Sequence, residues 1–267
     1  QGIDITLKGD LTNGQQATTD DAGATTIRAG SITALVDEDS DVAASLNLTV
    51  NKLINNPGGY LQSTDGLSIN ADEFDNNDGY VLAIERTDGV DADETSAFTD
   101  ANWSIDATTI NNDAGIIEKN NDGTLTLTGT TLSNTNSAAI MVADALNIDH
   151  AIITNNLSSL IGASVDIDAT TLNNSGGAIQ GESIAITLTG DLTNSDQSVT
   201  GEDGLTTQTA GVITALVDED SVTSWTLPLT TSPLTMAMYW PLNAQMAPTL
   251  MKPKVLQIQT GLLQQQR

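Results

Sequence analysis

Two aspartates, Asp166 and Asp168, alternate with apolar residues at the start of the segment SVDIDATTLNNSGGAI, residues 164–179. Side chains two positions apart on a strand point to the same face, so these carboxylates would lie side by side. Paired carboxylates cleave glycosidic bonds when a cleft holds them and separates their pKa values. Because Val165 and Ile167 occupy the buried positions between them, we interpret both aspartates as outward-facing and predict no enzyme activity. A carbohydrate-active enzyme that uses this pair is the alternative.

His150 is the only histidine in a chain that has no cysteine. Any Ser-His-Asp site would therefore need this residue, and thiolate chemistry and disulfides are excluded. His150 occupies an alternating position in the segment Asn147-Ile148-Asp149-His150, and we interpret it as a solvated strand residue. We predict no catalytic residue and no cofactor-binding residue.

A third chemical possibility is a calcium site in the acidic segment that contains Asp88, Asp91, Asp93 and Glu94. Carboxylate oxygens are the ligands that Ca²⁺ prefers. The spacing lacks the EF-hand loop pattern, and tandem G-G-x-G-x-D nonapeptides do not occur. We interpret the segment as a solvated acidic loop, with Ca²⁺ binding as the alternative.

The chain of 267 residues carries 35 acidic and 8 basic residues, a formal charge of −27. Such a surface repels phosphate backbones and anionic lipid heads, which predicts no nucleic-acid partner. No apolar run approaches the roughly 20 residues that cross a bilayer, so no membrane insertion is expected. The first residue, Gln1, is not an initiator and no leader follows it, which leads us to expect an internal fragment of a longer protein.

One short phrase recurs along the chain: an apolar-x-apolar pair, a gap, and then apolar-x-Asn. The asparagines that close the phrase are Asn13, Asn55, Asn76, Asn112, Asn134, Asn155, Asn174 and Asn194, at successive spacings of 42, 21, 36, 22, 21, 19 and 20 residues. Alternation predicts short strands, and Asn and Gly predict the turns between them. Aligned amides at one turn can bond to each other along a stack, so we interpret these residues as a structural asparagine ladder.

The period near 20 predicts an all-β parallel β-helix, a solenoid that stacks on itself. Leucine-rich repeats have a similar length, but no 3.6-residue periodicity lasts three turns here. We interpret residues 85–100 as a loop inserted into one long interval. For the other long interval we expect an additional turn of the solenoid without its Asn, around Ile27 to Val36.

A longer repeat overlies the short one. ITLKGDLTN at Ile5 recurs as ITLTGDLTN at Ile186, and ITALVDED at Ile32 recurs at Ile213, both at an offset of 181 residues. We therefore assign residues 1–221 to the β-helix, with a second long block that begins near residue 182.

The repeat stops in the tail, residues 222–267. With chosen codons, Asp78 to Ala83 read one nucleotide later gives the sequence of Met236 to Pro241, and residues 101–105 likewise give residues 259–263. Both matches share an offset of 158 residues (236 − 78 and 259 − 101). Our hypothesis is that the tail is an out-of-frame reading of the repeat, and we expect it to be disordered or poorly packed.

The phrase L-x-I-x-A-x-x-L-x-N-x-x-G-x-I resembles the haemagglutinin repeat of filamentous-haemagglutinin-like exoproteins. Segments that carry the likeness are Leu67-Ser-Ile69-Asn-Ala71, Trp103-Ser-Ile105-Asp-Ala107, Val165-Asp-Ile167-Asp-Ala169 and Leu172-Asn-Asn174-Ser-Gly-Gly177-Ala-Ile179. The resemblance covers roughly residues 3–221 and implies a right-handed β-helix.

Membership of that family would imply a large adhesin of a Gram-negative bacterium, secreted through an outer-membrane transporter by two-partner secretion. The expected function is that of a structural shaft that presents binding regions at the cell surface. The expected partner is a receptor or glycan on a host cell or a neighbouring cell. A Ca²⁺-binding surface repeat protein is a further alternative.

Overall fold

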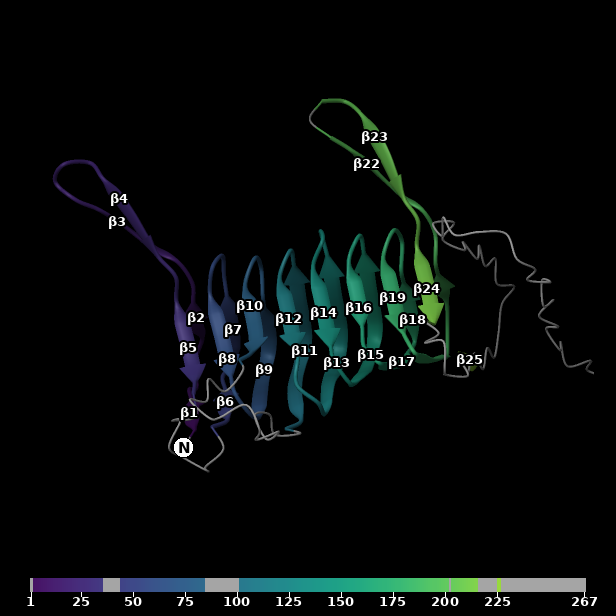
Figure 1. The fold of residues 1–267 in the computed structure, drawn as a ribbon, viewed down its shortest axis with the longest axis horizontal. Coiled ribbons are helices and arrows are strands. Elements are labelled where there is room, and N and C mark those ends of the chain that lie inside the picture. Colours follow the sequence, from purple (N-terminus) through teal and green to yellow (C-terminus); the bar gives the residue numbers. More distant parts are fainter. Residues whose placement is uncertain (1, 36–43, 85–100, 202, 216–224, 227–267) are drawn as a thin grey trace, which may run out of the picture. The chain divides into compact units, whose positions relative to one another are not determined.

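The computed structural model describes residues 2–35, 44–84, 101–201, 203–215 and 225–226 (Figure 1). Every described residue belongs to one compact unit of the chain. Within the described residues the structure contains strands and no helix. The prediction of an all-β protein is therefore confirmed.

Two parallel sheets contain most of the strands, and we call them the long sheet and the short sheet. The long sheet has 13 strands; its main path is β1 (Ile3–Thr6), β6 (Leu46–Thr49), β9 (Leu67–Asp75), β11 (Trp103–Asp113), β13 (Thr124–Thr135), β15 (Ala145–Asn156), β17 (Ser164–Ala169), β20 (Ser183–Leu188) and β25 (Trp225–Thr226). Beside this path lie β2 (Leu11–Asn13), β7 (Lys52–Asn55), β18 (Thr171–Asn173) and β21 (Leu192–Thr193).

The short sheet has 8 strands, one from each successive repeat of the chain. In chain order they are β5 (Ser31–Ala34), β8 (Tyr60–Ser63), β10 (Tyr80–Ala83), β12 (Ile116–Lys119), β14 (Ala139–Val142), β16 (Ser159–Ile161), β19 (Ala178–Gly181) and β24 (Val212–Ala215). The chain visits the long sheet and then the short sheet in every repeat. We call one such visit to both sheets a coil and number the coils 1 to 8 by these strands.

Buried aliphatic side chains at the same position of successive coils form continuous files between the two sheets. Ile105, Leu127, Ile148 and Ile167 are direct partners in the registers of β11, β13, β15 and β17. None of the four is more than 2% exposed. The single file that the 20-residue spacing predicts is present. This file and the parallel aliphatic files beside it provide the bulk of the apolar burial, since aromatic residues make up only 3% of the chain.

The 42 residues between Asn13 and Asn55 do not contain the additional solenoid turn that the sequence predicts near Ile27 to Val36. β1 pairs directly with β6 and β2 with β7, so coils 1 and 2 are adjacent. The extra residues form an antiparallel hairpin of β3 (Gln16–Thr19) and β4 (Thr25–Arg28), outside both parallel sheets. All eight strand residues of this hairpin are exposed. The prediction failed because a strand with two solvated faces carries no apolar alternation.

A second hairpin occupies the equivalent place in coil 8. β22 (Gln197–Thr200) pairs antiparallel with β23 (Thr206–Thr209), and each of its residues lies 181 positions after its counterpart in the first hairpin (197 − 16 and 206 − 25). Figure 1 shows the two hairpins as separate ribbons beside the stacked sheets. The duplicated block therefore repeats the hairpin as well as the coil.

The other long interval contains the predicted insertion at residues 85–100, which lies outside the described residues. Its flanking strands, β10 and β11, pair with the strands of the neighbouring coils in unbroken register. Most of the predicted tail is likewise outside the described residues. Within it, β25 pairs with β20 through Ile184 and Trp225.

Truncation of one buried side chain in the central file tests the packing. We expect Leu127→Ala to lower the free energy of unfolding by about 2–5 kcal/mol, because Ile105 and Ile148 on either side cannot close the cavity. Urea unfolding followed by circular dichroism measures the change. The matched control is Thr126→Ala on the outward position of the same strand, expected to cost about 0.5 kcal/mol or less. Equal costs for the two variants would contradict the buried file.

Candidate functional site

The eight asparagines named from the sequence lie in one hydrogen-bonded series at the corner where the long sheet leads into the short sheet. In every link the Nδ2 atom of one asparagine donates to the Oδ1 atom of the asparagine in the next coil. The donor–acceptor distances of the links are 2.7–2.9 Å. The links run Asn13, Asn55, Asn76, Asn112, Asn134, Asn155, Asn174 and Asn194 in chain order.

In the first seven of these asparagines, Asn13 to Asn174, the side-chain amide also joins the two sheets. The Nδ2 atom of Asn13 also donates to the backbone oxygen of Tyr60, and that of Asn112 donates to the backbone oxygen of Ala139. Each acceptor is the first strand residue of the short sheet in the next coil. The remaining acceptors follow the same rule and are the carbonyls of Tyr80, Ile116, Ser159, Ala178 and Val212. Each of these amides therefore links two neighbouring coils and also links the long sheet to the short sheet.

Glycine follows several ladder asparagines because the amide of the previous coil occupies the space that a side chain would need. A Cβ atom on Gly115 would clash with the backbone oxygen of Asn76 and with the amide oxygen of Asn112. In coil 1 the corresponding residue is Gly30, whose Cβ would clash with the amide oxygen of Asn13. The hairpin is therefore inserted between a ladder asparagine and its glycine, at a point where the corner itself is undisturbed.

Asp166 and Asp168 lie exposed on the outer face of β17, while Val165 and Ile167 between them are at most 1% exposed. This is the outward placement that alternation predicts. Asp168 is in register with Asp149 of the neighbouring strand, so a third carboxylate shares the face. The two predicted candidates are brought together on an open sheet surface.

His150 lies in the interior and has no exposed surface, so its interpretation as a solvated residue is wrong. It follows Ile148 by two positions on β15 and therefore points inward with it. Gly129 is its register partner, and a Cβ there would lie 3.1 Å from the Nε2 atom of His150. The glycine makes room for the imidazole. Neither ring nitrogen has a hydrogen-bond partner among the described residues.

Burial lowers the pKa of His150 from its ordinary value of 6.5, and the backbone of Leu127 and the charge of Asp149, which act to raise the pKa, oppose this only in part. The neutral imidazole is thus the form that the interior accepts. An unpaired, enclosed histidine does not have the geometry of a general base, which must reach a substrate.

Two charged clusters were missed by the sequence analysis. Lys119 on β12 has no exposed surface, and its Nζ atom donates to the backbone oxygens of Asn121, at 2.8 Å, and Asp122. In the same corner region of an earlier coil the indole nitrogen of Trp103 donates to the backbone oxygen of Asp65 at 2.7 Å. Strand alternation alone would have found Lys119, since it lies two positions after buried Ile117.

The second cluster lies on the surface where β7, β9 and β11 meet. The Nζ atom of Lys52 lies 2.9 Å from the carboxylate of Glu73 and 2.6 Å from that of Asp75. Hydrogen bonds to Asp75 and then Glu73 raise the pKa of Lys52. For Asp75, partial burial acts to raise the pKa, but the hydrogen bonds from Lys52 and Asn111 outweigh it and the pKa is lowered. The cluster neutralises acidic charge along the sheet.

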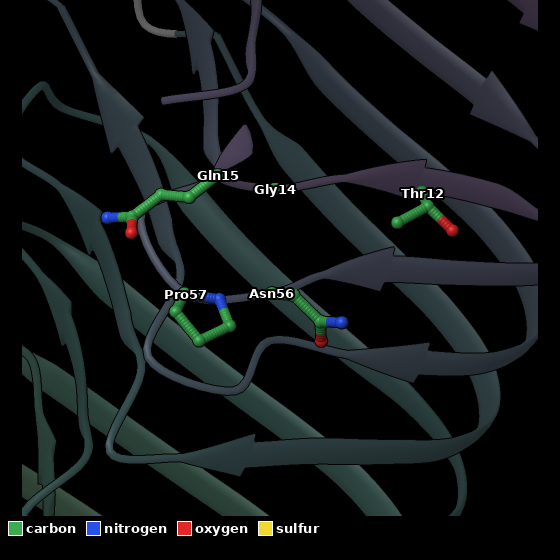
Figure 2. A pocket seen from close by; sticks show the side chains of 5 residues that line it. All are labelled: Thr12, Gly14, Gln15, Asn56 and Pro57. Atoms are coloured by element: carbon green, nitrogen blue, oxygen red, sulfur yellow. The ribbon is translucent and has the colours of Figure 1, made fainter. Parts of the chain in front are cut away.

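A pocket of about 350 Å³ opens beside the base of the first hairpin. Figure 2 shows Thr12 and Gln15 on one segment of the chain, with Asn56 and Pro57 on the segment below them. The backbone N–H of Gln15 donates to the carbonyl of Pro57 at 3.1 Å. The lining contains no titratable side chain, so this pocket supports no acid–base chemistry.

The outer faces of the two sheets differ in charge. The long sheet shows carboxylates to solvent in many coils, among them Asp106, Asp149, Asp166 and Asp168. The outward residues of the short sheet form two files with a single ionisable acid, Glu118. The first file is Ser31, Tyr60, Tyr80, Ile116, Ala139, Ser159, Ala178 and Val212, and the second is Thr33, Gln62, Leu82, Glu118, Met141, Ile161, Gln180 and Thr214. We call these sixteen residues the neutral face.

Comparison of the chain with protein-family models, with curated proteins and with solved structures gave no match. The proposed calcium ligands Asp88, Asp91, Asp93 and Glu94 lie outside the described residues. Within the described part, no group of three or more His, Cys, Asp or Glu side chains could hold a metal ion. Nor does that part contain a helix with the length and hydropathy of a membrane span.

Removal of one corner amide tests the ladder. We expect Asn112→Ala to destabilise the fold by about 1–3 kcal/mol for each neighbouring buried amide group left unpaired, on Asn76 and on Asn134. Exposed Asn70 provides the control, and Asn70→Ala is expected to leave the urea midpoint almost unchanged. A midpoint for Asn112→Ala that matches the control would show that the ladder contributes no stability.

The buried imidazole predicts a pH dependence. Because the pKa of His150 is lowered in the folded state, the unfolded chain binds the proton more readily. The free energy of unfolding therefore rises with pH between the lowered pKa and the ordinary value of 6.5. The contribution of the neutral His150 side chain to folding stability is complete above the ordinary pKa of 6.5 and is lost as pH falls through the lowered pKa. Urea midpoints between pH 8 and pH 5 should therefore decrease for the natural chain and decrease less for His150→Leu. The same slope in both proteins would exclude His150 as the cause.

Proposed function

We propose that this chain is a right-handed parallel β-helix that serves as the structural shaft of a large secreted, adhesin-like bacterial exoprotein. The observation that carries the proposal is the unbroken register of eight coils, joined by one asparagine ladder. A stack of this kind is extended by repetition of one coil, and its length is set by the number of coils.

The alternation of the chain between the two parallel sheets supports the β-helix. Each ladder asparagine lies at the end of a strand region of the long sheet. In coils 2 to 7 the short-sheet strand begins a few residues later, and in coils 1 and 8 the hairpin lies between the two. The files of buried aliphatic residues run between the sheets, as the interior of a solenoid requires. A single coil cannot offset the entropy of ordering about twenty residues, so the coils depend on their neighbours.

The inserted segments support a role in presentation. Both hairpins are solvated on their two faces, and they carry exposed apolar side chains at Ile27, which is 62% exposed, and Leu205, which is 69% exposed. They recur in coils 1 and 8, seven coil spacings apart, which corresponds to about 34 Å along the stack. Loops on a rigid scaffold commonly carry recognition, and residues 85–100 are a third candidate.

In this proposal the full-length protein leaves a Gram-negative cell through an outer-membrane transporter and remains at the cell surface. The presented segments bind a receptor or glycan on a host cell or a neighbouring cell. The acidic outer face of the long sheet disfavours anionic polymers such as nucleic acid as ligands. The family assignment rests on the resemblance of the repeated phrase to the haemagglutinin repeat.

A lengthened chain tests the shaft. Insertion of one additional block of 181 residues in register at the block boundary should lengthen the particle by about 34 Å and leave its cross-section unchanged. Small-angle X-ray scattering measures both quantities. Growth in the cross-section, or a radius of gyration that follows compact-domain scaling, would contradict a shaft.

Presentation is tested by shortening the first hairpin. Replacement of residues 16–28 by a short glycine–asparagine turn should leave the urea midpoint nearly unchanged, because the hairpin lies outside both parallel sheets. Binding of the fluorescently labelled chain to intact bacterial and epithelial cells should fall. Replacement of the second hairpin is the matched comparison, and undiminished binding after both replacements would exclude the hairpins as binding regions.

A further inference from the structure

The neutral face is unusual for a chain with a formal charge of −27. Sixteen outward residues over eight coils include one carboxylate, two tyrosines, a methionine and several aliphatic side chains. Tyr60 and Tyr80 stack with ring centroids 4.8 Å apart and an interplanar angle of 10°. Depletion of charge together with enrichment in Tyr and Met is the composition of the centre of a protein interface.

We propose that the neutral face pairs with the neutral face of a second copy, with the coils of the two copies running in opposite directions. Two copies of so acidic a chain repel each other on most of their surface, and this face is where the repulsion is least. A two-fold axis parallel to the strands would place each file opposite the same file of the partner copy. Coil 1 then faces coil 8, coil 2 faces coil 7, and coil 4 faces coil 5.

The first file is self-complementary in size under this symmetry. Its large residues, Tyr60, Tyr80 and Ile116, occupy coils 2, 3 and 4. The small residues Ala178, Ser159 and Ala139 occupy coils 7, 6 and 5. Each large side chain therefore opposes a small one, which is the arrangement that lets two sheet faces interdigitate.

The second file is matched in polarity except at Glu118. Leu82 in coil 3 opposes Ile161 in coil 6, and Gln62 in coil 2 opposes Gln180 in coil 7. The carboxylate of Glu118 in coil 4 faces Met141 in coil 5. The other face-to-face symmetry, with the axis along the stack, would oppose Tyr60 to Gln62 and Tyr80 to Leu82 within the same coil, so that large side chains would meet large ones. The antiparallel arrangement is therefore the one that the residues favour.

The size of the face sets the strength of the contact. Seven strand spacings by four residues span about 34 Å by about 13 Å, or on the order of 450 Å² per copy. Stable dimers bury about 800 Å² per partner, so this chain would form a weak, concentration-dependent dimer. High salt should strengthen it, because screening reduces the repulsion between the acidic surfaces.

Charge substitutions at the centre of the face test the pairing on the full chain. Met141→Glu places a second carboxylate opposite Glu118 and should weaken association about tenfold or more, whereas Met141→Lys should strengthen it. Analytical ultracentrifugation in low and high salt measures the dissociation constant. The controls are Thr126→Glu and Thr126→Lys, which add the same charges to an equally exposed position of coil 5 on the long sheet. Equal effects at both positions, or a monomer at every concentration and salt, would overturn the proposal.

Thiol cross-linking tests the register directly, since the natural chain has no cysteine. A mixture of Leu82→Cys chains and Ile161→Cys chains should cross-link with a bismaleimide reagent that spans about 8 Å, because sheet faces pack about 10 Å apart. Either variant alone should not, because its symmetry mates lie three coils apart, about 14 Å along the stack. Cross-linking of the single variants to the same extent, or of no sample, would reject the antiparallel face. Either result leaves the proposed shaft untouched, because the length added by each block does not depend on pairing.

Discussion

A buried amide without partners costs free energy, and the hydrogen bonds by which the ladder asparagines avoid this cost organise the molecule. Asn55, Asn112 and Asn155 have no exposed surface, so each must find both donors and acceptors within the protein. The asparagine of the previous coil provides the donor and that of the next coil provides the acceptor, and each can do so only when it lies at the same corner in register. The ladder therefore fixes where each coil turns from one sheet to the other. The aliphatic files follow from it, because alternation along the strands then places equivalent residues above one another.

The same constraint determines where the chain accepts insertions. Asn13 bonds to Asn55 across 42 residues at 2.9 Å and Asn76 bonds to Asn112 across 36 at 2.7 Å, close to the 2.7 Å of the link across 20 residues. Extra residues are accommodated after the corner amide or after the short-sheet strand, where the ladder is not interrupted. The spacing between asparagines is variable in sequence and constant in space. This is why the stacked coils can carry hairpins without loss of register.

Alternation and the repeated asparagine were enough to predict the parallel coils, the inward file through Ile105 and the outward position of Asp166. They were not enough for the hairpins, whose strands have no buried face and so produce no apolar period. His150 was misplaced although the pattern was sufficient, because Ile148 two residues earlier already fixed the inward direction. The neutral face was not evident because its residues are scattered at intervals of about twenty and become a surface only when the register is known. The calcium candidates and most of the tail lie outside the described residues, and both remain predictions.

The hydrogen bonds of the ladder all run in one direction. Every side-chain amide presents its N–H group toward the C-terminal coil and its oxygen toward the N-terminal coil. Aligned in this way, the amide dipoles add along the column and polarise one another. The column consequently has an electropositive end and an electronegative end. Any segment that terminates the stack must offer an acceptor at one extremity and a donor at the other, so the two extremities cannot be closed by the same kind of cap.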